Sequence, residues 1–332
     1  MKKLFNTLKY SFSIIGAVIG AGFITGKEII QFFYGRNPFL SISIFFLLLF
    51  GLTYILLKKE LNASGAFLQV GNYIIYLFNL LIMASMLSAV DSLAETLLGI
   101  SKNIPVFSIL LIIISSLVSL NGLEKISIVN TILVLASLVV FFGIILLNTG
   151  NISNVKLNNS GIYKVASYTS MNIFLAQPFI FKIKKEKKNF SPFGVALIVS
   201  IILSVAIFFF LKVIEPDALC VDIPIILLVN SNKYLYYLTA FIILVSIFTT
   251  LLAVQFPYLS VYKNNNYAVF VGATLAAFVI SRVGFSAIVE KIYPMMAIVS
   301  LIYYSLFIAT ALFSFLKKQP NNTLARLKHK EL

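Results

Sequence analysis

The first apolar stretch of the chain contains residues that are poorly suited to a regular helix. Segment 16–28 carries four glycines and ends in a charged pair, Lys27 and Glu28. Gly20 and Gly22 are two residues apart, so on a helix they point in different directions and cannot form one packing face. Glycine also lowers helix stability. The pattern therefore favours a broken helix over the usual alternative, a close helix-packing surface of small residues.

A break inside a membrane segment has a defined chemistry. Irregular backbone at that depth is tolerated where it lines a cavity or is buried in protein. Amides freed around Gly20, Ala21, Gly22 and Phe23 would donate to an anionic group, and freed carbonyls would suit a cation. An acidic side chain within a membrane segment is costly and indicates function, so Glu28 is a candidate for substrate binding or for proton coupling.

A second polar segment lies in the other half of the chain. Residues 167–172 read Ser-Tyr-Thr-Ser-Met-Asn, and Gln177-Pro178 follows. We expect another interruption here, with Ser170 and Asn172 on the wall opposite the first break, because paired interruptions in two halves indicate a transporter binding site. Asn172 can equally be an interhelical hydrogen-bonding residue.

Two carboxylates, Asp91 and Glu95, are one helical turn apart. Such a pair could share a proton and serve in coupling. Alternatively, both reach water at the membrane surface, with Lys102 as a possible partner. The chain has one cysteine, Cys220, and one histidine, His329. A metal cluster and the usual general base are therefore not expected, which argues against an enzyme and against a cofactor.

The composition sets the class of element that carries these residues. The chain has 332 residues, of which 60% are hydrophobic and 11% charged, against roughly 25% charged in soluble domains. We predict an all-α polytopic membrane protein, since spanning helices need about 20 apolar residues each. About ten spans are expected, at 10–34, 39–57, 71–99, 104–120, 125–148, 161–181, 191–213, 232–262, 267–283 and 286–316. The short apolar stretch 218–230 is expected to be a re-entrant or surface segment.

The charge distribution indicates membrane topology rather than a nucleic-acid partner. The formal net charge is +15, but the basic residues form short clusters between apolar runs instead of a stripe with interleaved aromatics. Lysine and arginine are more frequent in alternate loops, which places both termini in the cytoplasm of a multi-pass cell-membrane protein. No sequence feature specifies an oligomeric state.

Two motifs carry a family resemblance. Segment 20–29, GAGFITGKEI, continues to Gln31, Phe32 and Phe33, and a second motif runs from 283–286 (VGFS) to Tyr293-Pro294. Together they resemble YkvI-type membrane proteins of the amino acid–polyamine–organocation superfamily. One departure is Lys27, where the family pattern has Gln. Its charge would either change the substrate or pair with Glu28.

The resemblance implies a single transporter domain over 1–332 with a LeuT-like five-plus-five inverted repeat. Repeat one would cover about 10–148, repeat two about 161–316, and 317–332 would be a cytoplasmic tail. Spans one and six would be broken at the bilayer centre and would hold the substrate between them.

The resemblance also implies a sodium site. Carbonyls of Gly16 and Ile19 would face hydroxyls of span eight. There, Ser246 shares one face with Thr249 and Thr250 because they are three and four residues apart. The alternative is that these hydroxyls bond back to their own helix.

We therefore predict a secondary active transporter that couples Na⁺ or H⁺ to the symport of an amino acid or similar small solute. Its expected partners are that solute and the lipid bilayer, with no nucleic acid, and no metal is expected beyond a possible Na⁺. Two alternatives remain: a non-transporting membrane sensor or accessory protein with the same fold, and a membrane-embedded enzyme.

Overall fold

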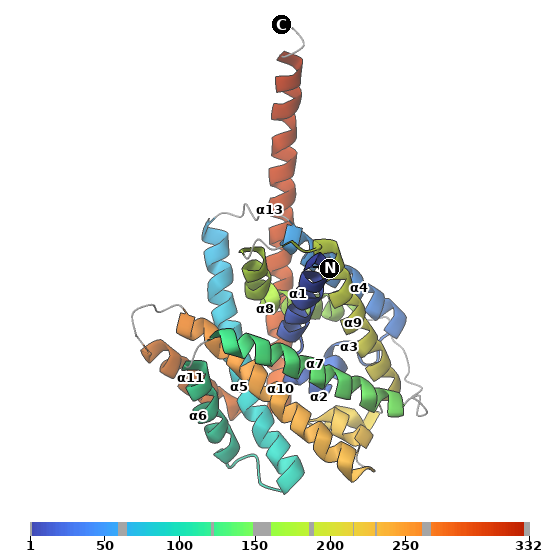
Figure 1. The fold of residues 1–332 in the computed structure, drawn as a ribbon, viewed down its shortest axis with the longest axis vertical. Helices are drawn as coiled ribbons and strands as arrows, with labels where there is room; N and C mark the ends of the chain where they lie inside the picture. The colour runs from blue at the N-terminus through green and yellow to red at the C-terminus, as the bar shows by residue number, and fades with distance from the viewer. Residues whose placement is uncertain are drawn as a thin grey trace.

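The computed structural model describes residues 2–58, 65–120, 123–148, 161–185, 189–214, 216–229, 231–260 and 267–328. This part of the chain is built from helices joined by short connections (Figure 1). The first half contains α1 (Lys2–Val18), α2 (Ala21–Thr25), α3 (Lys27–Phe33), α4 (Pro38–Lys58), α5 (Gly65–Leu98), α6 (Val106–Leu120) and α7 (Leu123–Leu147).

In the described residues of the second half, four short helical segments lie between the long helices: η1, η2, α12 and η3. The elements of this half are α8 (Ile162–Lys185), α9 (Pro192–Val213), η1 (Pro216–Cys220), η2 (Pro224–Val229), α10 (Lys233–Ser260), α11 (Ala268–Ser281), α12 (Phe285–Ala287), η3 (Ile288–Ile292) and α13 (Tyr293–Lys328). The segment expected to be re-entrant or surface-bound forms the 3₁₀ helices η1 and η2. The predicted tail continues α13 as a helix to Lys328, and 329–332 lie outside the described residues.

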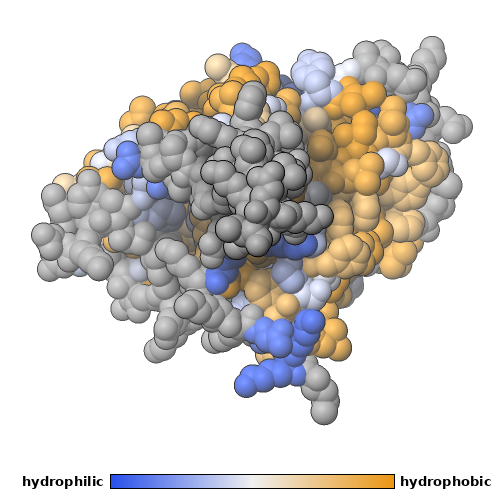
Figure 2. Space-filling view, turned by 90° about the horizontal axis from the view of Figure 1, so that it is seen from above, coloured by the Kyte–Doolittle hydropathy of each residue, from blue (hydrophilic) through white to orange (hydrophobic). Residues whose placement is uncertain are grey.

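Length and composition define the molecule as a membrane protein. Within the described residues, five helical segments are long and apolar enough to cross a bilayer: Pro38–Lys58, Gln69–Leu98, Pro192–Val213, Lys233–Leu259 and Phe285–Thr310. Large apolar side chains also face outward, including Val139, Leu275 and Val279, which are 71%, 61% and 69% exposed. Figure 2 shows a broad hydrophobic area on one face. Such a surface is stable next to lipid, which is as apolar as the side chains themselves.

Several helices pack around α8, and a second group packs around α5 and α10. Helix α8 contacts α1, α4 and α13, while α5 contacts α10 and α11, and α10 contacts α7. The ring of Tyr168 on α8 lies 4.7 Å from that of Phe32, 5.5 Å from that of Phe33 and 6.2 Å from that of Phe45. These aromatic contacts fix α3 and α4 against α8, and α3 is the helix that carries Glu28.

The predicted break in span six is wrong. Helix α8 is continuous from Ile162 to Lys185, and Pro178 lies inside it. Its polar side chains bond within the helix instead of opening it. The hydroxyls of Thr169 and Ser170 donate to the carbonyl oxygens of Val165 and Ala166, at 2.8 and 2.9 Å. A hydroxyl that bonds four residues back needs no other partner in the membrane.

Candidate functional site

The first span is interrupted twice. Helix α1 ends at Val18, Ile19 and Gly20 are not helical, and α2 begins at Ala21. Gly20 has an extended backbone, and its amide donates to the carbonyl oxygen of Val18 at 3.1 Å. Gly26 then separates α2 from α3 with a φ of 82°, a left-handed conformation that favours glycine. The glycines therefore produce the irregular segment that their spacing indicates.

The turn at Gly26 directs Glu28 back onto α2. A β-carbon built on Gly22 would lie 1.9 Å from Oε1 of Glu28, so the carboxyl group occupies the space that a side chain at position 22 would need. The other carboxyl oxygen, Oε2, accepts a hydrogen bond from the hydroxyl of Tyr168 at 3.1 Å. Glu28 is 6% exposed. A carboxyl group is thus held at the break, inside the protein.

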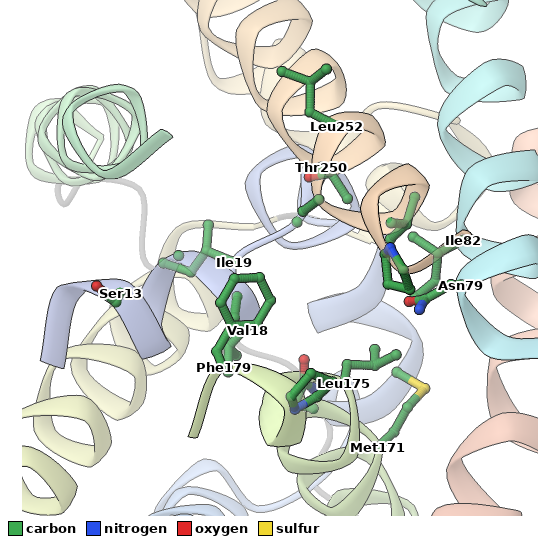
Figure 3. A pocket seen from close by; sticks show the side chains of 18 of the residues that line it. Ser13, Val18, Ile19, Asn79, Ile82, Met171, Leu175, Phe179, Thr250 and Leu252 are labelled. Carbon is green, nitrogen blue, oxygen red and sulfur yellow. The ribbon is translucent and has the colours of Figure 1, made fainter. Parts of the chain in front are cut away.

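Glu28 lines a cavity of about 240 Å³ that borders the first break. The walls come from distant parts of the chain. Figure 3 shows Val18 of α1, Ile19 of the break, Asn79 of α5, Met171 of α8 and Thr250 of α10 around this space. Tyr293 and Met296 of α13 complete it. This volume lies slightly below the usual range of ligand pockets, about 300–1,000 Å³, so the cavity suits a small solute rather than a large one.

Only some of the residues predicted to bind the substrate line the cavity. Gly20, Glu28 and Asn172 line it, whereas Ala21, Gly22, Phe23 and Ser170 are not among its lining residues. Asn172 donates from Nδ2 to the carbonyl oxygen of Tyr168 at 3.0 Å, so it bonds within its own helix. Its place in the cavity wall distinguishes it from a purely structural asparagine.

Likewise, only some of the predicted ion-binding residues line the cavity. Gly16, Ile19 and Thr250 line the cavity, and Ser246 and Thr249 do not. Thr250 is next to the break, since a β-carbon on Gly20 would lie 3.6 Å from Oγ1 of Thr250. The hydroxyls of Thr249 and Thr250 donate to the carbonyl oxygen of Ser246, at 3.1 and 2.8 Å. Their hydrogens are thereby used, while each oxygen keeps lone pairs that can bind a cation.

Asp91 and Glu95 do not form the expected proton-sharing pair. Asp91 bonds to Nη2 of Arg282 at 2.7 Å and accepts from the amide of Ser108 at 3.0 Å. Glu95 instead contacts Nζ of Lys102 at 3.5 Å and is 41% exposed. Each carboxylate has its own cation, because the two side chains meet different connections at this end of the protein. Neither one lines the cavity.

Lys27 does not pair with Glu28. Its Nζ donates to the carbonyl oxygens of Leu219 and Val221, both at 3.1 Å, and lies 3.0 Å from Oε1 of Glu290. The lysine therefore ties α3 to the connection between α9 and α10. Sequence reasoning missed these partners because each lies more than 190 positions further along the chain.

A second polar cluster holds the same connection. Asp222 accepts hydrogen bonds from Ser92 at 3.0 Å and from Ser286, and its carboxylate lies 3.3 Å from Nζ of Lys102. Burial raises the pKa of Asp222, but these hydrogen bonds and the lysine charge outweigh it and hold that pKa below its ordinary value. The one signal in the sequence was an acidic residue inside an otherwise apolar stretch.

The apolar spanning helices and the buried site define a polytopic helical membrane protein. No protein-family model matches the chain. The chain is 27% identical over 330 residues to the uncharacterized membrane protein YkvI of Bacillus subtilis (strain 168), a match that covers 88% of this chain and 92% of that protein. The resemblance predicted from the two motifs is confirmed: the chain is a relative of YkvI.

The solved structures that match the chain in three dimensions include one of a transporter. It is the crystal structure of the Eremococcus coleocola manganese transporter in complex with an aromatic bis-isothiourea substituted compound. The match has a TM-score of 0.39 and 12% sequence identity, and covers 95% of this chain and 72% of that chain. At that score the likeness does not define a shared fold.

Proposed function

We propose that the protein is a secondary active transporter for a small solute, coupled to Na⁺ or H⁺. One observation carries this proposal: the broken first span borders a cavity that contains a buried acidic side chain, Glu28. Non-helical backbone and a buried carboxylate are both costly in a membrane, so their coincidence at one cavity favours a binding site. An amino acid or a similar solute fits the size and mixed polarity of the walls.

We further propose the architecture that goes with this function. The chain belongs to the amino acid–polyamine–organocation superfamily, with ten spans in a five-plus-five inverted repeat and both termini in the cytoplasm of the cell membrane. Helices α1 to α13 occupy the expected spans to within a few residues at most boundaries, which supports the count. Because α8 is continuous, span one rather than span six supplies irregular backbone at the cavity in this conformation.

Alternating access would require the opening of polar contacts on the side of the protein away from Lys9. Lys9, an exposed residue, lies at one end of the lining. Lys27 binds the connection between α9 and α10, and Asp222 in that connection binds Ser92 and Lys102. In this proposal these contacts close the outer side, and the cavity faces the cytoplasm. Transport then requires them to separate while the inner side closes.

The coupling ion has two candidate positions. Sodium would lie between carbonyls near Gly16 and Ile19 and the hydroxyl of Thr250, which all border one space. A proton would instead use Glu28. Hydroxyl and carbonyl oxygens are suitable ligands for a hard monovalent cation, and a carboxyl group is a suitable proton carrier.

Uptake by the purified protein in liposomes tests the proposal. Radiolabelled amino acids are supplied under an inward Na⁺ gradient, a pH gradient or neither. We expect accumulation that depends on one gradient, and loss of that uptake in Gly22→Leu. If Na⁺ is the coupling ion, Thr250→Val should also lose the Na⁺ dependence. Unchanged uptake and ion dependence in both correctly inserted variants would contradict the mechanism, and solute binding without any uptake would favour the sensor.

A further inference from the structure

We propose that Glu28 is the anchor for an ammonium group, so that the cavity selects amphipathic amines: solutes with a cationic nitrogen and an apolar body, for which a carboxylate is not required. This inference rests on the proposed function and names its substrate class. It follows from the charge of Glu28, from the acceptors beside it and from the apolar walls.

The carboxyl group of Glu28 lacks a cationic partner within the described part of the chain. Its one hydrogen-bond donor there is the neutral hydroxyl of Tyr168. Lys27 is adjacent in sequence, but its Nζ is held by Glu290 and by two carbonyl oxygens in another direction. A buried carboxylate without a counter-ion is strongly disfavoured. A cation supplied from the cavity would remove that cost.

The surroundings of Glu28 offer further acceptors for the three N–H donors of an ammonium group. The amide nitrogen of Asn172 donates to the carbonyl oxygen of Tyr168, the same residue whose hydroxyl binds Glu28. The amide oxygen of Asn172 therefore remains as an acceptor on the cavity wall. Asn79 adds a second amide to that wall, and Figure 3 shows it next to Ile82 on α5.

The rest of the cavity wall is apolar. Ile82, Met86, Met171, Leu175 and Met296 line it. Methionine side chains are flexible and adapt to ligands of different shape. Such walls suit an alkyl or aryl body attached to the bound nitrogen, because burial of that body removes apolar surface from water.

The cavity has little to offer a carboxylate. The backbone at Ala21, Gly22 and Phe23, which the glycine pattern identified as anion donors, lies outside the lining. Lys9 is the one cationic side chain in the described lining, and it is exposed at the N-terminal end. Recognition therefore depends on the amine. An acid of the same shape would place its negative charge against Glu28.

Three matched compounds test the selectivity. They are leucine, its decarboxylated analogue 3-methylbutylamine, and its deaminated analogue 4-methylpentanoate. Binding to the full-length protein in detergent is measured by calorimetry and by the shift in melting temperature. We expect both compounds with an amine to bind and the acid not to bind. Glu28→Gln, which keeps the size and an acceptor for Tyr168, should weaken amine binding by about tenfold or more.

Two further variants complete the design. Glu95→Gln removes a partly exposed carboxylate outside the cavity and should leave amine binding unchanged. Glu28→Asp keeps the charge and should retain the preference for amines with lower affinity, which gives a second measurement if Glu28→Gln folds poorly. Equal binding of the acid and the amine, unchanged amine binding in Glu28→Gln, or no binding of any of the three compounds would overturn the inference.

The same variants in liposomes separate this inference from the transport proposal. Amine binding that requires Glu28, without uptake, would retain the ammonium site and reject transport. Uptake of a solute that does not require Glu28 would retain transport and reject the ammonium site.

Discussion

Glu28 and Gly22 occupy one space: Oε1 of the glutamate lies where the β-carbon of any other residue at position 22 would be, at a separation of 1.9 Å. The glycine is therefore needed for more than the break in the helix. It admits a carboxyl group to the inner face of α2, where Tyr168 binds the second oxygen. The site depends on this contact, because a side chain at position 22 would displace the carboxyl group that lines the cavity.

Gly22→Ala should displace Glu28 and destabilise the protein. Overpacking of this kind costs about 1–3 kcal/mol. Gly272→Ala is the matched control on α11, since its β-carbon would meet nothing within 4 Å, and its melting temperature should not fall. In the double variant Gly22→Ala/Glu28→Ala the steric conflict is gone. Its loss of stability should therefore be smaller than the sum of the losses in the two single variants. Additive losses in thermal unfolding would show that the contact is absent.

Gly26 is constrained by its backbone and by a neighbour. It has a φ of 82°, and a β-carbon there would lie 2.1 Å from Cζ of Phe210. Gly35 has a φ of 73° but open space around it. Gly35→Ala should therefore cost only the left-handed backbone penalty, about 1–2 kcal/mol, and Gly26→Ala should cost more. Phe210→Leu should recover part of the difference. Equal melting temperatures for the two alanine variants would contradict this packing.

The carboxylate of Asp222 should make stability depend on pH. Its pKa in the folded state is held below the ordinary value, because hydrogen bonds from Ser286 and Ser92 and the charge of Lys102 outweigh the effect of burial. The resulting stability is fully present above the unfolded pKa, about 3.9, and is lost as the pH falls through the lower folded pKa.

Thermal unfolding as a function of pH measures this contribution. Asp222→Asn should melt below the wild type near neutral pH, and the gap should narrow in acid. Asp217→Asn, an exposed residue of the same connection, is the control and should follow the wild type throughout. A gap between the wild type and Asp222→Asn that stays constant from neutral to acid pH would argue against an ionised Asp222 in this cluster.

Lys27 and Glu290 form an ion pair in which the lysine is buried and the glutamate is exposed. The lysine side chain is 4% exposed and the glutamate side chain 45%. Lys27→Met would leave the partly buried carbonyl oxygens of Leu219 and Val221 without their donor, at no more than about 1–3 kcal/mol for each group. Glu290→Gln removes a partly exposed pair worth about 1 kcal/mol or less. The lysine variant should thus unfold at the lower temperature, and the reverse order would mean that the ion pair, not the carbonyl contacts, stabilises this connection.

The features that the sequence predicted are local ones. Apolar runs define the helices, and the spacing of Gly20 and Gly22 is enough to indicate an irregular first span. The family resemblance depends on the same short segments. These patterns need no knowledge of which helix neighbours which.

The ion pairs and hydrogen bonds that the sequence did not predict join residues far apart in the chain. Lys27 and Val221 are 194 positions apart, and Asp91 and Arg282 are 191 apart. Residue types alone could not pair them. The wrong prediction for α8 has a different cause. Its polar residues suggest a break, but serine and threonine hydroxyls can bond to carbonyls of the preceding turn and leave the helix continuous. Polar composition therefore did not determine helix continuity.

The most direct test of the central claim is solute counterflow with the purified protein. Liposomes are loaded with unlabelled 3-methylbutylamine and diluted into a trace of the labelled amine, and the wild type is compared with Glu28→Gln and Glu95→Gln. The proposed transporter should exchange the label in the wild type and in Glu95→Gln, and should lose exchange in Glu28→Gln. A folded wild-type protein that binds the amine but never exchanges it would contradict transport through this cavity.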